Sequence, residues 1–256
     1  VEGEVLEISS GPPNLLTDEQ ERVREAVSSG EPQWDKEAIR EELEDVTLPF
    51  HFLDFETVQP AVPVWPNTSP FETIPFQWSD HVVREGGRSY HDEYLSVLKE
   101  DPRRGFTQNL LKRLDDGGSI FVYSSYEERM LQDLADNDKL LEEVAQGQPD
   151  KTPADLRAEL EDAIDRLVDL LPIVRNHIYD PGFEGSFSIK NVLPALTDGE
   201  FSYDDLDIKN GAMASAAFLE MVSPRTGVNR RMQIAKNLRH YCERDTEAMW
   251  ELLRHT

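Results

Sequence analysis

The feature that most restricts the fold is a pair of carboxylates inside an apolar segment. Residues 48–55 are dense in apolar and aromatic side chains, which indicates a buried β-strand, and Asp54 and Glu56 lie at its C-terminal end. Side chains at positions i and i+2 of a strand project from the same face, so these two carboxylates point together. On a buried strand they repel each other and are costly to desolvate unless a cation neutralises them.

A divalent metal ion would remove this electrostatic cost. Carboxylate oxygens are ligands that suit Mg²⁺ or Mn²⁺. The spacing of Asp54 and Glu56 therefore favours a metal site on this strand. The same sequence is also consistent with an exposed strand end at which water hydrates both carboxylates and no metal binds. This alternative stays open.

A second acidic motif lies near the C-terminus, in a segment that predicts a helix over residues 229–254. Tyr241 and Asp245 are spaced i and i+4, which places the phenol and the carboxylate on one face of that helix. A carboxylate there can reach a metal held by another element, and the phenol can orient an attacking water. The alternative is that Tyr241 packs on the sheet and Asp245 is a surface acid.

A third acid, Glu127, follows a short apolar strand at residues 119–123 and stands where a helix begins. This position would bring its carboxylate beside the sheet. A glutamate in the first turn of a helix is also favoured by the helix dipole alone. Glu128 and Asp133 compete for the same role.

The order of predicted elements indicates an α/β fold, in which a mixed β-sheet is flanked by helices. The predicted strands are residues 48–55, 76–84, 89–97 and 119–123, and the predicted helices are residues 21–27, 36–44, 106–114, 127–145, 154–176, 188–196, 212–221 and 229–254. Residues 1–46 predict an N-terminal helical appendage, and residues 47–256 the main domain.

The charge balance, 26 basic against 51 acidic residues and a net charge of −25, argues against a nucleic-acid partner. The dispersed acids are typical of a halophile-like surface, where salt screens self-repulsion, although an ordinary acidic protein gives the same count. Cys242 is the single cysteine, which excludes an intrachain disulfide and fits the cytoplasm. No apolar run approaches the roughly 18 residues of a membrane span, so we expect no membrane partner.

Several segments together resemble a bacterial family of domains of unknown function within the ribonuclease H-like DEDD exonucleases, in the tyrosine subgroup. The resemblance covers roughly residues 48–253. The strings that carry it are FLDFET (residues 52–57), IPFQWS (74–79), VY with YE (122–123 and 126–127), GSFSIKNVLP (185–194) and YCERDT (241–246).

The resemblance implies a ribonuclease H-like fold and a metal-dependent 3′→5′ exonuclease that hydrolyses single-stranded DNA or RNA. Two Mg²⁺ or Mn²⁺ ions, about 4 Å apart, would be held by Asp54, Glu56, Glu127 and Asp245. Tyr241 would position the nucleophilic water as a further catalytic residue. The substrate groove would include Thr57, Tyr123, Ser188 and Lys190.

Members of this family often follow a RecB-like or Cas4-like nuclease domain, so the resemblance also implies such a linked partner. Glu127 stands where the superfamily usually has aspartate. Two other interpretations stay open. One is a catalytically weak or inactive nucleic-acid-binding module that is associated with a nuclease. The other is an acidic protein–protein interaction module with residues 1–46 as a docking arm.

Overall fold

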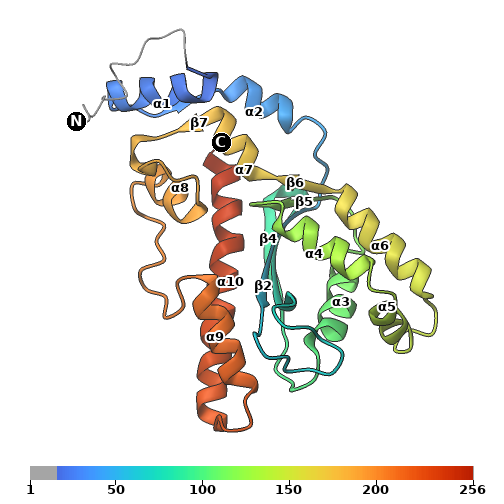
Figure 1. The fold of residues 1–256 in the computed structure, drawn as a ribbon. Coiled ribbons are helices and arrows are strands. Elements are labelled where there is room, and N and C mark those ends of the chain that lie inside the picture. The colour runs from blue at the N-terminus through green and yellow to red at the C-terminus, as the bar shows by residue number, and fades with distance from the viewer. Residues whose placement is uncertain (1–15, 256) are drawn as a thin grey trace, which may run out of the picture.

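A computed structural model of the protein describes residues 16–255 (Figure 1). The strands are β1 (Gln33–Trp34), β2 (Phe50–Val58), β3 (Ile74–Arg84), β4 (Arg88–Leu95), β5 (Ser119–Val122), β6 (Leu167–Asp169) and β7 (Ile178–Tyr179). The helices are α1 (Asp18–Ser29), α2 (Lys36–Glu42), α3 (Pro102–Arg113), α4 (Tyr126–Ala135), α5 (Asp138–Ala145), α6 (Pro153–Asp165), α7 (Leu170–His177), α8 (Ile189–Leu196), α9 (Gly211–Val222) and α10 (Val228–His255).

The main sheet has five strands in the order β4-β3-β2-β5-β6. Strands β2, β3 and β4 pair antiparallel, whereas β5 is parallel to β2 and β6 is parallel to β5. The tight turn between β3 and β4 uses Gly86 and Gly87, both at positive φ, which glycine adopts without steric penalty. This mixed sheet with its helices confirms the predicted α/β class.

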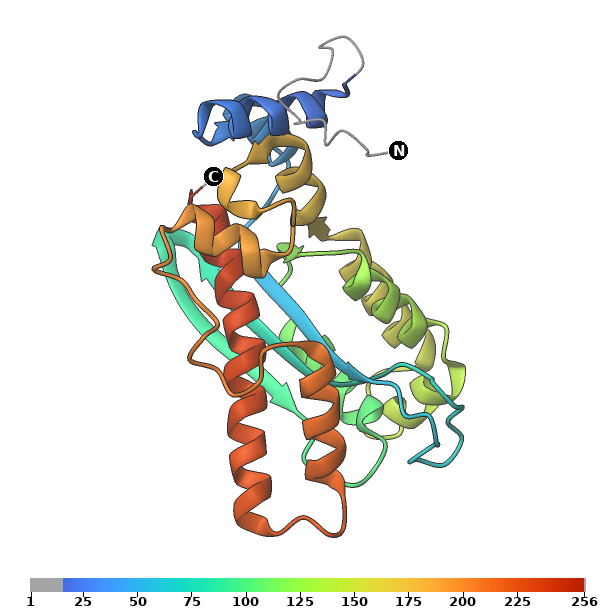
Figure 2. The ribbon, with the colours of Figure 1, turned by 60° about the vertical axis from the view of Figure 1, so that its left-hand side comes forward.

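Helices cover both faces of the sheet, as the two views show (Figures 1 and 2). Strand β2 alternates between the two hydrophobic cores, because successive side chains of a strand point to opposite faces. Phe52 and Val58 belong to the core that includes α7 to α10. Leu53 and Phe55 belong to the core that includes α3 to α6. Asp54 and Glu56 therefore face the side of α9 and α10.

One predicted helix, residues 154–176, is wrong. The chain forms α6, then strand β6, then α7. Leu167 and Asp169 pair with β5, and the Asp169 carboxylate caps α7 by accepting from the Leu171 N–H at 2.9 Å. Pro172 stands in the first turn of α7, where a missing N–H is tolerated. Pairing in the sheet thus overrides a continuous helical pattern.

The predicted single helix over residues 127–145 is also wrong, because the chain turns between α4 and α5. Asn137 begins a new helix, and its side chain accepts from the Leu140 N–H at 3.0 Å. Asparagine favours this capping position, since its side-chain oxygen satisfies an otherwise unpaired amide. The break lets both helices turn apolar residues toward α6.

The helices predicted before residue 46 are present. Thr17 and Gln20 form the capping box of α1. Strand β1 pairs with β7, while Ala26 and Ile39 join the same core as α7. Residues 1–15 of the predicted appendage lie outside the described residues, and the boundary at residues 46 and 47 stays a prediction. Between residues 16 and 255, no helix has the length and apolar character needed to cross a membrane.

Candidate metal centre

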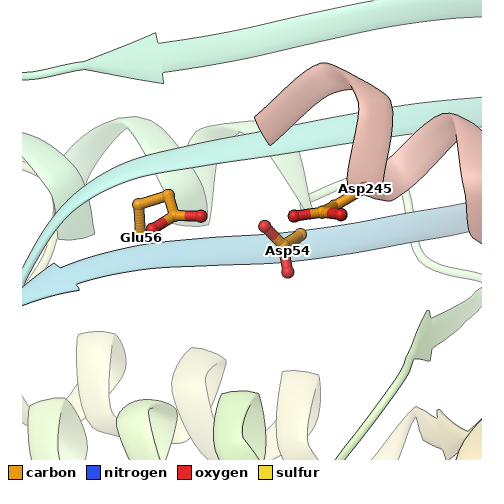
Figure 3. A group of neighbouring side chains, drawn as sticks. All are labelled: Asp54, Glu56 and Asp245. Carbon is orange, nitrogen blue, oxygen red and sulfur yellow. The ribbon is translucent and has the colours of Figure 1, made fainter. Parts of the chain in front are cut away.

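Three carboxylates meet where β2 passes under α10. Asp54, Glu56 and Asp245 each offer an oxygen, and these oxygens lie within 4.8 Å of one another. Figure 3 shows the two side chains of β2 on the side of the strand that faces α10, with Asp245 coming from the helix. Residues some 190 positions apart in the sequence thus form one acidic cluster.

Packing of α10 across the sheet fixes this arrangement. The Gln77 side chain of β3 donates to the Leu238 carbonyl at 3.0 Å, and the fully buried Cys242 lies with Sγ 3.4 Å from Asp54 Oδ2. Tyr241 and Asp245 lie one turn apart on the same buried face of the helix, as their spacing predicts. The helix therefore presents both side chains to β2.

Burial makes this cluster electrostatically unfavourable in its charged form. Desolvation, with the charges of Asp245, Glu56 and Glu127 adding to it, raises the pKa of Asp54 well above its ordinary value. Desolvation and the charge of Asp245 raise the pKa of Glu56 to about 8. Desolvation also raises the pKa of Asp245, although the ammonium of Lys190 opposes the shift. A cation among these oxygens would favour their ionised forms.

The donor set fits a divalent cation. Three carboxylates supply the hard oxygen ligands that such ions prefer. The buried Asp245 Oδ1 has no hydrogen-bond partner among residues 16–255, which is costly unless a further ligand satisfies it. Lys190 Nζ lies 3.6 Å from Asp245 Oδ2 and donates to the Tyr241 hydroxyl at 2.5 Å. One ammonium balances only part of the charge of three carboxylates.

Glu127 lies in the same cleft but outside the three-carboxylate cluster. Its Oε2 accepts from the Ser124 hydroxyl at 3.4 Å. Desolvation raises the pKa of Glu127 to about 7. Hydrogen bonds from the backbone N–H groups of Glu127 itself and of Phe55 oppose this shift. Its predicted place beside the sheet is thus observed, while its role as a metal ligand stays a prediction. Of its two competitors, neither Glu128 nor Asp133 lines the cleft.

The cleft beside the cluster has a volume of about 640 Å³, within the ~300–1,000 Å³ typical of ligand sites. All nine residues predicted for catalysis, metal binding or substrate binding line it: Asp54, Glu56, Thr57, Tyr123, Glu127, Ser188, Lys190, Tyr241 and Asp245. The structure therefore gathers every predicted site residue in one place.

Among the further residues that line the same cleft, sequence reasoning missed Arg175 and Phe187. Phe187 stands directly before the predicted site residue Ser188, in the string GSFSIKNVLP (residues 185–194). Its position in that string is a signal from which a place in the cleft could have been predicted. Arg175 lies on α7, in the segment that was predicted as one long helix. Nothing in the sequence indicated which way that part of the chain faces.

Comparisons with known proteins assign a family but no activity. Neither the curated proteins nor the solved structures yield a match to the chain. The profile of one family, described as a domain of unknown function (DUF2779), matches residues 51–188. The matched region contains Asp54, Glu56 and Glu127, and Asp245 lies beyond it. Because the match covers more than half of the 256 residues, the chain belongs to the DUF2779 family.

Proposed function

We propose that the protein is a metal-dependent 3′→5′ exonuclease that hydrolyses the phosphodiester bonds of single-stranded DNA or RNA. The observation that carries this proposal is the meeting of Asp54, Glu56 and Asp245 within 4.8 Å, at a cleft open to a ligand. Clusters of buried carboxylates hold the paired cations of enzymes that cleave phosphodiesters. The mixed sheet is also the architecture that a ribonuclease H-like relationship implies.

Each side chain has a distinct part in this proposal. Asp54, Glu56 and Asp245 would hold Mg²⁺ or Mn²⁺, and Glu127 would support a second ion. Bound divalent ions supply an activated water and neutralise charge on the phosphate. Tyr241 orients that water through its hydroxyl. The Lys190 ammonium, beside Tyr241 and Asp245, provides a contact for a phosphate oxygen.

The test is hydrolysis of 5′-labelled single-stranded DNA and RNA with Mn²⁺, at low and at molar salt. We expect progressive shortening that requires the metal, disappears in Asp54→Asn and leaves a circular strand intact. Asp133→Asn is the matched control, because it makes the same chemical change at an exposed acid of α4. If the wild-type protein cleaves neither strand under any of these conditions, the proposal is wrong.

One observation favours a second candidate, a catalytically weak or inactive nucleic-acid-binding or protein-interaction module associated with a nuclease. The Glu127 carboxylate accepts a hydrogen bond from Ser124 and lies outside the three-carboxylate cluster. The proposed second ion would therefore have few protein ligands. If the module binds nucleic acid, wild type binds single strands without shortening them. Glu127→Asp would then be the first substitution to test for a gain of hydrolysis.

A further inference from the structure

The cleft has a second region whose chemistry differs from that of the acidic cluster. Helix α7 contributes Arg175, and the segment before α8 contributes Phe187. The guanidinium carbon of Arg175 lies 5.7 Å from the centre of the Phe187 ring. Within residues 16–255, Arg175 and Lys190 are the two cationic side chains that line the cleft.

Among residues 16–255, no carboxylate lies within ion-pair distance of the Arg175 guanidinium, although the charge of Asp169 acts on it from farther away. The Arg175 side chain is exposed and forms no ion pair with any residue between 16 and 255. In a protein with 51 acidic residues, a guanidinium that lines a cleft and makes no close ion pair with the described residues is available for a ligand anion. Guanidinium groups bind phosphate through two parallel hydrogen bonds, which fixes its orientation.

Phe187 is held in place by the elements around it. Its ring contacts Tyr179 and Phe183 edge-on, with centroid distances of 5.9 and 6.1 Å. Its carbonyl accepts from the Tyr123 hydroxyl at 3.0 Å. The ring is half-buried and lines the cleft, so it offers a fixed aromatic surface. Such surfaces bind nucleobases of any sequence by stacking.

We infer that Arg175 and Phe187 form a nucleotide subsite that binds one phosphate and one base of a single-stranded nucleic acid, an inference that rests on the proposed function. A strand in the cleft would place the bond to be cut at the metal-bound carboxylates and a neighbouring nucleotide at this subsite. The pairing of a cation with an aromatic ring matches the alternating phosphate and base of such a strand.

Binding of fluorescent single-stranded DNA and RNA of equal length to the full chain tests the subsite. Anisotropy is measured in Ca²⁺ over a range of NaCl concentrations. We expect Arg175→Gln to weaken binding about tenfold and to reduce the salt slope by ~0.7, the value for one lost phosphate contact. Phe187→Leu should weaken binding by a similar factor without changing the slope, because stacking is lost and charge is retained.

Arg225→Gln is the matched control, since Arg225 is exposed in the loop between α9 and α10 and does not line the cleft. It should bind as wild type does. Stabilisation by Mn²⁺, measured by thermal unfolding, should be the same in all three variants, which separates loss of the subsite from loss of the fold or of the metal centre.

The outcomes distinguish the subsite from the function on which it rests. If wild type binds and shortens the strand while Arg175→Gln and Phe187→Leu behave as Arg225→Gln does, the subsite is overturned and the exonuclease stands. If wild type binds neither DNA nor RNA at any salt concentration, both are overturned. Weaker binding with the two different salt slopes supports the subsite.

Discussion

At the scale of single residues, Lys190 supplies a positive charge beside the acidic cluster. Its ammonium lies 3.6 Å from Asp245 Oδ2 and 4.4 Å from the centre of the Tyr241 ring. A divalent ion that binds the carboxylates is repelled by this charge. We therefore expect Lys190→Met to bind Mn²⁺ on the order of tenfold more tightly, a difference of ~1.4 kcal/mol, as measured by isothermal titration calorimetry.

The same substitution should reduce hydrolysis, because the proposed phosphate contact is lost. Lys209→Met provides the control, since Lys209 hydrogen-bonds to the Asp204 carbonyl and does not line the cleft. Unchanged or weaker Mn²⁺ affinity in Lys190→Met would contradict this view of the charge balance.

The raised pKa of Glu56 predicts how stability without metal depends on pH. Its pKa is about 8 in the folded protein against 4.5 for the free side chain, so the folded state holds an extra proton between these values. Stability in EDTA should therefore fall as the pH rises from about 5 to 8. Thermal unfolding at several pH values measures this slope, which should be shallower in Glu56→Gln.

Mn²⁺ should reverse the trend, because it binds the deprotonated carboxylates and its stabilisation grows with pH. A melting temperature in EDTA that rises between pH 5 and pH 8, in wild type but not in Glu56→Gln, would refute the burial of a protonated Glu56.

Most of the candidate centre could be predicted at this scale. Strand periodicity alone places Asp54 and Glu56 on one face, and helical spacing places Tyr241 and Asp245 on another. The contribution of Arg175 could not be predicted, because it depends on how α7 packs and not on the local sequence.

At the scale of elements, a buried ionic network joins β2, β3 and α3 on the face of the sheet away from the candidate metal centre. His51 Nδ1 lies 2.8 Å from Asp80 Oδ2, and Arg113 Nε lies 2.8 Å from the same oxygen. His51 and Asp80 are fully buried. Removal of one partner from such a network leaves the others uncompensated.

We expect Asp80→Asn to lower the free energy of unfolding by about 3 kcal/mol. This corresponds to a fall of ~6–12 °C in melting temperature for a protein of this size. Asp92→Asn should change little, because Asp92 is exposed and lies 4.0 Å from Arg113 Nε. Equal melting temperatures for the two variants would contradict a stabilising network, and Mn²⁺ affinity should be unaffected in both.

The long central elements could be predicted from the sequence, and the short ones could not. In strands β2 and β3 and in helix α10, the pattern of apolar residues is long enough to distinguish a strand from a helix. Strand β6 has three residues, and it is defined by the pairing of Leu167 and Asp169 with β5. Because that pairing involves residues some 47 positions away, no local pattern reveals it.

At the scale of the whole molecule, the net charge of −25 predicts a dependence on salt. Repulsion among dispersed acids is screened as the Debye length falls from ~10 Å at 0.1 M to ~3 Å at 1 M. The melting temperature at pH 7 should therefore rise by several degrees between 0.1 and 1 M NaCl. The rise should shrink near the isoelectric point of about 4.5, where the net charge disappears.

A melting temperature at pH 7 that stays constant or falls over this range would contradict self-repulsion as a limit on stability. The same titration in the presence of Mn²⁺ separates the local charge of the three-carboxylate cluster from that of the surface, because a bound divalent ion would offset two of the three negative charges of the cluster.

Because the acidic cluster combines residues of β2 and α10, its assembly depends on the order in which translation makes them. A ribosome makes Asp54 and Glu56 before Asp245, which follows only after nearly two hundred further residues. Every unfinished or prematurely stopped chain that ends before Asp245 carries two of the three carboxylates and lacks the helix that covers them. The three-carboxylate cluster therefore cannot assemble on any of these partial chains.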